Sequence, residues 1–184
     1  MVGIALSQAG QRLHQVKVRI FEPGEWRTYK DLRLHALAES PDAFGSTFAT
    51  ESERSDEEWA YRLASGARSA WDLPLLAELD ACPIGLAWGK IETSEPAVAN
   101  LYQMWVHPDF RGRGAAQLLL EAVIDWAKSR HAAVLELDVT CGYTPAARLY
   151  FRNGFRPVGA PVPLRPGSDI MEQKMRLMLN DLPA

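Results

Sequence analysis

The spacing of apolar and polar positions predicts alternating strands and helices along the chain. Runs with the length and apolar pattern of β-strands fall at residues 16–21, 71–79, 84–91, 98–106, 133–139, 155–158 and 170–178. Runs with apolar residues at helical spacing fall at residues 25–39, 55–66, 113–130 and 144–153. The predicted order of elements is therefore β-α-α-β-β-β-α-β-α-β-β.

Local signals mark several ends of these elements. Ser55 and Glu58 form a capping-box pattern, and Thr144 is an N-cap followed by proline at the first helical position. Residues 80–83 (DACP) suit a hairpin turn, and residues 161–166 carry three prolines and are predicted to be a loop. Hairpins pair antiparallel strands and a strand–helix–strand unit pairs parallel ones, so we expect an α/β fold with a mixed sheet flanked by helices.

Composition and charge narrow the class of protein. A chain of 184 residues suits a single domain over residues 1–184 with a core at about 16–179. It is 47% hydrophobic and 23% charged, as soluble globular proteins are, and its net charge of −3 gives no basic field for nucleic acid. No apolar run approaches the roughly 20 residues that span a bilayer, and residues 1–15 lack a signal-peptide pattern. We therefore expect a cytoplasmic protein that binds neither nucleic acid nor membrane.

The two cysteines, Cys82 and Cys141, lie far apart and form no CxxC pair. Two are too few for a disulfide scaffold, and neither stands in a metal-binding or redox motif. We expect each to be a buried, reduced thiol, and we expect no metal centre.

A joint of glycine and arginine separates the predicted strand 98–106 from the helix that follows. Arg111, Gly112, Arg113 and Gly114 stand at the start of that helix. A helix N-terminus exposes unpaired N–H groups and the positive end of its dipole, and glycine lets the backbone approach a ligand closely. The joint therefore predicts an anion site suited to phosphate.

Two nucleotide-binding motifs are excluded by spacing. After Gly112 and Gly114, a dinucleotide fingerprint needs a third glycine or an alanine where this chain has Gln117. A P-loop needs serine or threonine after Gly-Lys, but the pair at 89–90 is followed by isoleucine in a predicted strand. Two glycines alone also suit an ordinary turn, so the choice depends on the residues around them.

The surrounding pattern resembles the acetyl-coenzyme A motif of the GNAT superfamily of N-acetyltransferases. The core of that motif is Arg/Gln-x-x-Gly-x-Gly/Ala, which Arg111, Gly114 and Ala116 fill here. A second family pattern, A-x-x-L-Y-x-x-x-G-F, is matched by residues 146–155 (AARLYFRNGF). Residues 40–51 (SPDAFGSTFATE) further resemble the helix-loop-helix that lines the acceptor pocket in many members.

The resemblance implies a function and a set of binding residues. It implies transfer of an acetyl group from acetyl-coenzyme A to a primary amine of a small molecule or peptide. The strand backbone, the loop amides and the turn before the helix 144–153 would hold the coenzyme. The implied coenzyme-binding residues are Met104, Trp105, Val106, Arg111, Gly112, Arg113, Gly114, Ala115, Ala116, Tyr143 and Ala146. Members often carry asparagine where this chain has Tyr143, which otherwise is a turn residue at the solvent edge.

The resemblance also implies one catalytic residue. Tyr150 falls where the family tyrosine protonates the departing coenzyme thiolate, a task that suits a phenol. The alternative is that Tyr150 only packs against the sheet. Members often carry a glutamate where this chain has Asn100, and an amide cannot take a proton at neutral pH. The proton then passes through water to a carboxylate such as Glu78 or Glu92, or to His107, or the amine arrives neutral.

The acceptor side has two interpretations. Five acids lie between Glu51 and Glu58, and they either attract a cationic amine or, in part, complement the dipole of a helix's first turn. Likewise Phe44, Phe48 and Trp59 either line the acceptor pocket or belong to the core.

The rival function is a non-catalytic acyl-coenzyme A sensor or regulatory module of the same fold. Asn100 and Tyr143 favour it, and the retained Tyr150 argues against it. The final strand and the Pro-rich loop could also pair at the edge of a homodimer.

Overall fold

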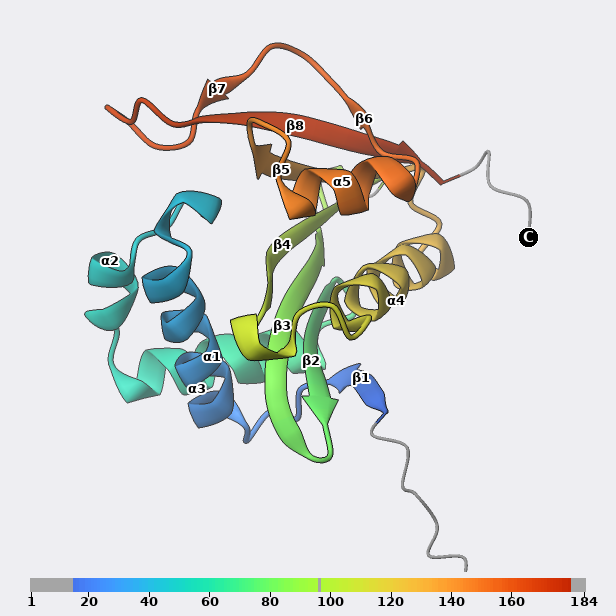
Figure 1. The fold of residues 1–184 in the computed structure, drawn as a ribbon. Helices are drawn as coiled ribbons and strands as arrows, with labels where there is room; N and C mark the ends of the chain where they lie inside the picture. The colour runs from blue at the N-terminus through green and yellow to red at the C-terminus, as the bar shows by residue number, and fades with distance from the viewer. Residues whose placement is uncertain (1–14, 96, 180–184) are drawn as a thin grey trace, which may run out of the picture.

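The computed structural model describes residues 15–95 and 97–179, so the prediction of no signal peptide concerns residues outside the described part. Its centre is an eight-stranded mixed sheet in the order β1-β2-β3-β4-β5-β8-β6, with β7 pairing β8 (Figure 1). The strands are β1 Val16–Ile20, β2 Asp72–Leu79, β3 Cys82–Ile91, β4 Val98–Val106, β5 Val134–Thr140, β6 Arg156–Pro157, β7 Val162–Pro163 and β8 Met171–Met178. Within the described residues, β4 with β5 is the parallel pair.

Helices cover both faces of this sheet (Figure 1). One face carries the helices α1 Trp26–Glu39, α2 Phe48–Ser52 and α3 Asp56–Arg68, whose core is built around Tyr29 and Trp59. The other face carries α4 Ala115–Ser129 and α5 Pro145–Arg152, whose apolar sides pack on the sheet. Short 3₁₀ turns lie at Pro41–Ala43 and Pro108–Phe110.

The predicted helix starts rest on hydrogen bonds seen in the structure. Ser55 Oγ accepts from Glu58 N, and the Glu58 carboxylate accepts from Ser55 N, so the capping box that opens α3 is complete. Thr144 Oγ1 accepts from Ala147 N and caps α5. The start of α4 differs, because its N-cap is Gly114 in the left-handed region with φ 85°.

The predicted order of elements is confirmed, with small additions. The structure adds the five-residue helix α2 and, inside the predicted Pro-rich loop, the strand β7. The hairpin turn is tighter than predicted, because β3 begins at Cys82 and leaves the two residues 80–81 in the turn. Both Cys82 and Cys141 are exposed, so the prediction of buried thiols is wrong. Each cysteine stands at the end of a strand, where the chain turns towards solvent.

The parallel strands β4 and β5 separate after a short contact. They pair at only three positions, Val98–Asn100 against 134–136. Beyond these, β4 continues beside β3 towards Val106, whereas β5 continues beside β8 towards Thr140. The sheet therefore opens between its two central strands, and this opening faces the loop before α4 (Figure 1).

Candidate active site

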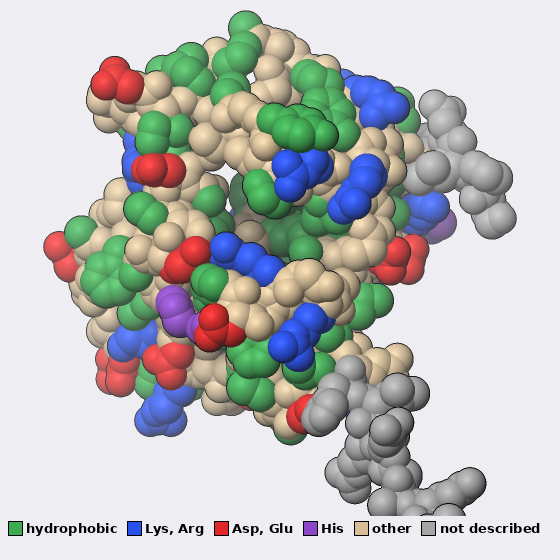
Figure 2. Space-filling view, in the orientation of Figure 1, with side chains coloured by type: hydrophobic (Ala, Val, Ile, Leu, Met, Phe, Trp, Pro, Cys, Tyr) green, Lys and Arg blue, Asp and Glu red, His purple; other side chains and the backbone are tan. Residues whose placement is uncertain are grey.

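A cavity of about 1760 Å³ fills the opening between β4 and β5. Its walls include residues 101–106 of β4, residues 137–140 of β5, the loop before α4 and the start of α5. The segment 43–46 after α1 closes it on the acceptor side, as the sequence resemblance implied. Figure 2 shows the hollow near the middle of this face, with hydrophobic side chains on its walls. A single-ligand pocket is typically about 300–1,000 Å³, so this cavity has room for two ligands.

A β-bulge shapes the β4 wall of the cavity. Leu86 of β3 pairs with Trp105 and Trp88 pairs with Tyr102, so two residues of β4 stand opposite one residue of β3. Gln103, in the bulge, has φ 56°. Bulged backbone groups leave the regular ladder of hydrogen bonds, so this part of β4 can present its backbone to a ligand.

The loop before α4 forms the predicted anion site. Gly112 and Gly114 have φ values of 77° and 85°, and a Cβ built on either meets no atom within 4 Å. The open space lies where the first N–H groups of α4 have no helical acceptor. Both glycines line the cavity, as do Ala115 and Ala116. A backbone cradle at a helix N-terminus, free of side chains, fits the pyrophosphate of a coenzyme A ester.

The two arginines of this loop have different roles. Arg111 donates from Nε to Val106 O at 3.0 Å and from Nη2 to Glu39 Oε2 at 2.7 Å. Its charge is therefore already balanced by a carboxylate, and Arg111 braces the loop against β4 and α1. Arg113 lies over the ring of Phe110 at 5.6 Å and stands outside the cavity lining.

Glu39, the last residue of α1, joins three parts of this site. Its Oε2 accepts from Trp105 Nε1 at 2.9 Å, from Arg111 Nη2 and from Ser40 Oγ. Burial raises the pKa of the Glu39 carboxyl, but the hydrogen bonds from Ser40, Trp105 and Arg111 outweigh it and bring the pKa to about 2.

We expect Glu39→Gln to lower stability at neutral pH by roughly 1 kcal/mol. The folded pKa of about 2 lies below the ordinary 4.5, so between these values the unfolded chain binds a proton that the folded protein does not. The contribution is therefore complete above about pH 4.5 and is lost as pH falls towards 2. Thermal unfolding of parent and variant across this window measures it. Glu53→Gln, at an exposed position, is the control. A difference in stability between the parent and Glu39→Gln that does not change with pH would contradict the hydrogen bonding of the Glu39 carboxylate.

Tyr150 lies on the cavity wall with its hydroxyl directed towards β4. The side chain is buried, and Oη lies 3.7 Å from Met104 Sδ, while the ring packs on Phe155. Burial raises the pKa of the Tyr150 phenol well above its usual value of 10. The hydroxyl is therefore protonated at any physiological pH and is available as a hydrogen-bond donor inside the opening.

The structure brings together most of the residues singled out in the sequence. The cavity is lined by Met104, Trp105, Val106, Arg111, Gly112, Gly114, Ala115, Ala116, Ala146 and Tyr150. Arg113 and Tyr143 stand outside this lining, and Tyr143 is 82% exposed with Arg148 over its ring. Their contact with the coenzyme stays a prediction.

The residues considered as proton acceptors are dispersed. Asn100 and His107 stand outside the lining, and the His107 ring packs between His35 and Phe110. Glu78 is held by Arg19 at 2.9 Å, also outside the lining. Glu92 does line the cavity, where it is paired with Lys90.

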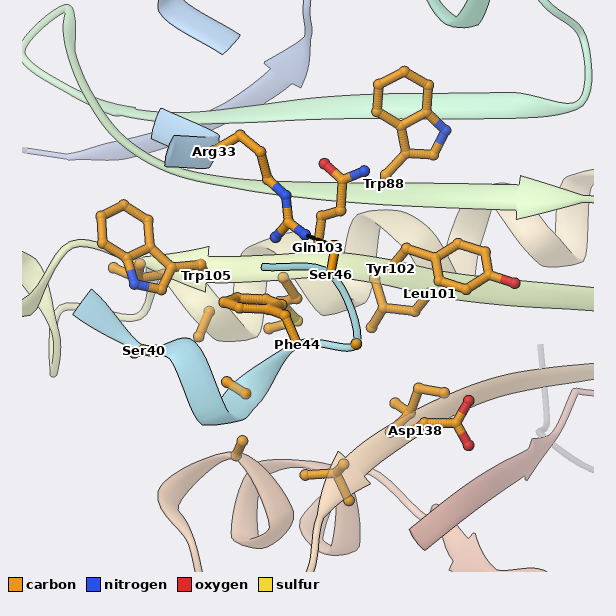
Figure 3. A pocket seen from close by; sticks show the side chains of 18 of the residues that line it. Arg33, Ser40, Phe44, Ser46, Trp88, Leu101, Tyr102, Gln103, Trp105 and Asp138 are labelled. Atoms are coloured by element: carbon orange, nitrogen blue, oxygen red, sulfur yellow. Dashed lines mark hydrogen bonds between the residues drawn. The ribbon is translucent and has the colours of Figure 1, made fainter. Parts of the chain in front are cut away.

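The acceptor-side candidates divide between cavity and core. Phe44 lines the cavity (Figure 3), whereas Trp59 is fully buried in the core and Phe48 is exposed outside the lining. The acidic run divides in the same way. Glu51 is buried in ion pairs, and Glu58 caps α3 and lines the cavity. The other three acids, Glu53, Asp56 and Glu57, are exposed outside the lining.

Sequence reasoning missed two parts of the wall. One is Arg33 of α1, which is 3% exposed and lines the cavity beside Gln103 (Figure 3). Its signal was present, because a charged residue four positions after Tyr29 and four before Leu37 falls on the apolar face of the helix. The other is a pair of carboxylates, Asp138 and Glu172, which had no local motif.

Comparisons with known proteins agree with this geometry. Residues 33–155 match the acetyltransferase (GNAT) family. A mycothiol acetyltransferase from Thermobispora bispora is 28% identical over 145 residues, which are 76% of this chain and 46% of that protein. The matched part spans less than half the length of each curated relative compared.

Solved structures of low sequence identity share the fold. A GNAT-family acetyltransferase from Streptococcus pneumoniae superposes with a TM-score of 0.74 at 21% identity, over 90% of this chain and 99% of that one. An acetyltransferase from Salmonella typhimurium, described with its cofactor acetyl-CoA, superposes with a TM-score of 0.72 at 19% identity, over 92% and 96%. Because the family match extends over more than half of the sequence, this chain belongs to the acetyltransferase (GNAT) family.

Proposed function

We propose that residues 1–184 form one N-acetyltransferase domain that moves an acetyl group from acetyl-CoA to a primary amine of a small molecule or peptide. One observation carries the proposal: the anion loop, the β4 bulge and Tyr150 all border the cavity where β4 and β5 separate. The cavity has space beyond that needed for one ligand, so an acceptor fits beside the coenzyme.

Each part of the site has a task in this reaction. The amides around Gly112 and Gly114 bind the pyrophosphate, and the backbone at 104–106 holds and polarises the thioester. The amine nitrogen attacks the acetyl carbon, the carbon–sulfur bond breaks, and the sulfur leaves as thiolate. Tyr150 donates its proton to that sulfur as the carbon–sulfur bond breaks, from a hydroxyl that lies at the β4 side of the opening.

The proton of the attacking amine has a candidate acceptor in Glu172. Burial raises the pKa of this carboxyl, and the negative charge of Asp138 adds to the effect while Lys174 opposes it. A carboxylate with a raised pKa is a better base at neutral pH than an ordinary one. Glu172 lies on β8 opposite Thr140, at the open end of β5, so it lines the acceptor side of the cavity.

We expect Glu172→Gln to lower kcat/KM at neutral pH by about 100-fold, because a general base typically contributes that much or more. The parent's kcat/KM should rise with pH as Glu172 loses its proton, and the variant should rise only where the amine itself titrates. Glu92→Gln is the matched control, since Glu92 lines the same cavity but is paired with Lys90. If the rise of kcat/KM with pH is lost in Glu92→Gln and kept in Glu172→Gln, Glu92 would be the proton acceptor.

The direct test of function is release of free coenzyme A from acetyl-CoA in the presence of an amine panel. Polyamines, aminoglycosides, amino acids and peptides with free N-termini cover the candidate classes. At least one should raise release well above the rate of hydrolysis. Tight binding of acetyl-CoA with no stimulation by any amine would instead support the non-catalytic sensor.

The location and assembly of the protein are also proposals. We propose a cytoplasmic location, because the sequence carries no signal-peptide pattern at residues 1–15. No helix in the described ranges is long and apolar enough to cross a membrane. A homodimer through the final strand would involve the outer segments β6 and β7, because β8 is paired on both sides. Sedimentation analysis of the purified protein decides whether a dimer forms.

A further inference from the structure

Arg33 is a buried cation with unused hydrogen-bonding capacity. Its side chain comes from α1 and is 3% exposed, and Nη2 donates to Ser46 Oγ at 2.6 Å. Nε and Nη1 are buried and have no hydrogen-bond partner among the described residues. These two nitrogens carry three N–H groups. The Arg33 side chain borders the cavity, and Figure 3 shows it beside Gln103. A buried donor without an acceptor is costly, so an arrangement of this kind in a cavity wall favours binding of a group that supplies acceptor oxygens.

The positive charge of the cavity wall around Arg33 is also not fully balanced by carboxylates. Glu51 is buried and accepts from Arg54 at 3.0 Å and Arg62 at 3.2 Å, so its carboxylate is already shared. The other carboxylate nearby, Glu58, is occupied in capping α3. Three guanidinium groups therefore face two carboxylates, leaving an excess of positive charge. Burial lowers the pKa of Arg33 to about 10, which still leaves it charged at neutral pH.

We propose that Arg33 binds a carboxylate of the acceptor, so that the amine substrate is an amino acid or a closely similar amino carboxylate. A carboxylate supplies the acceptor oxygens and the negative charge that this wall lacks. Phe44, whose ring lies 4.5 Å from the Arg33 guanidinium, holds the cation in place while leaving its N–H groups free. The inference deepens the proposed function and rests on it.

The opposite wall fits the other end of such a substrate. Asp138 of β5 and Glu172 of β8 line the cavity, and Figure 3 shows Arg33 and Asp138 on opposite sides of the pocket. Asp138 is paired with Lys174 at 3.7 Å, so Glu172 is the carboxylate of the two that is placed to attract an ammonium group and take its proton as it reacts. A cavity that is cationic on one wall and anionic on the other complements an amine that also carries a carboxylate.

The test compares amino acids with their primary amides, which share the amine but lack the carboxylate. With the parent protein, α-, β- and γ-amino acids should include acceptors whose kcat/KM exceeds that of the matched amide. In Arg33→Met, kcat/KM for those acids should fall about 10- to 100-fold, the loss expected for a hydrogen bond to a charged group. For the amides, kcat/KM should change little. Because the same acids and amides are measured with parent and variant, differences between their amine pKa values cancel.

Controls separate binding from folding. Arg27→Met removes an exposed arginine of the same helix and should leave the preference for acids intact. The unfolding temperature of Arg33→Met should equal or exceed that of the parent, because an apolar side chain of similar size removes a buried charge that lacks a partner. If this variant does not fold, Arg33→Lys takes its place in the same comparison, because lysine keeps the charge but lacks the guanidinium fork that holds a carboxylate.

Three results would overturn the inference. Equal kcat/KM for acids and amides in the parent would mean that bound water satisfies Arg33. If Arg33→Met lost acetyl-CoA affinity by the same factor as kcat/KM for amino acids, Arg33 would be assigned to the coenzyme. A preference for aminoalkyl phosphonates over amino acids would assign the site to phosphate. If no amine is acetylated at all, the proposed function fails instead, which the coenzyme A release assay shows independently.

Discussion

Gly114→Val should weaken acetyl-CoA binding by at least about tenfold, on the order of the loss of one or two hydrogen bonds to a charged group. Gly114 has φ 85°, a conformation that a β-branched residue strongly disfavours. Its missing Cβ points into open space at the N-terminus of α4, where the anion must approach the backbone. Valine would both strain the loop and fill the cradle. Calorimetry on the folded variant measures the effect.

The matched control for this variant is Gly159→Val. Gly159 also has a positive φ, 71°, with no atom within 4 Å of a built Cβ, and it stands outside the cavity lining. It should therefore show the stability cost of strain without the loss of coenzyme binding. An affinity of Gly114→Val within twofold of the parent would falsify the anion-loop assignment.

Tyr150→Phe should lower kcat by about tenfold or more while changing the affinity for acetyl-CoA little. The substitution removes the hydroxyl that lies 3.7 Å from Met104 Sδ in the β4–β5 opening, and it leaves the ring packed on Phe155. Because burial keeps the phenol protonated, the parent's rate should show no loss of this donor as pH rises to 9 or so. Steady-state kinetics with the best amine of the panel gives kcat and the coenzyme KM separately.

Tyr102→Phe is the control for this prediction. Tyr102 also lines the cavity, but its side chain is nearly half exposed, so its hydroxyl can remain hydrated. Its loss should change kcat by no more than a few-fold. An unchanged kcat in Tyr150→Phe, under conditions where chemistry limits the rate, would mean that Tyr150 only packs against the sheet.

The coenzyme side of the site could be predicted because its parts are local in sequence. The strand, the glycine loop and the helix start occupy residues 104–116, and the second motif occupies residues 146–155. Backbone cradles and helix N-termini depend on the spacing of glycines and caps along the chain, which a single sequence displays. Ten of the twelve residues named from these patterns and from the turn before the second one line one cavity, with Arg113 and Tyr143 outside it.

The role of Arg111 could not be predicted from that motif. The motif named Arg111 as a coenzyme-binding residue, but the structure pairs its guanidinium with Glu39, 72 positions earlier in the chain. Glu39 in turn holds Trp105, so one carboxylate ties α1 to β4 and the loop. An ion pair between distant segments leaves no pattern in either segment, since each residue alone suits a solvated surface.

The chain's own sequence determined the order of its elements, the helix caps and the anion loop, because these depend on neighbours within a few residues. Only the tertiary structure decided the acceptor side, where Arg33 of α1, Asp138 of β5 and Glu172 of β8 border one cavity. They meet because β4 and β5 part after three paired positions and α1 packs on the sheet against β3 and β4. The point where the strands separate and the place where α1 packs both depend on contacts between residues far apart in the chain. The local pattern of a single segment does not indicate such contacts.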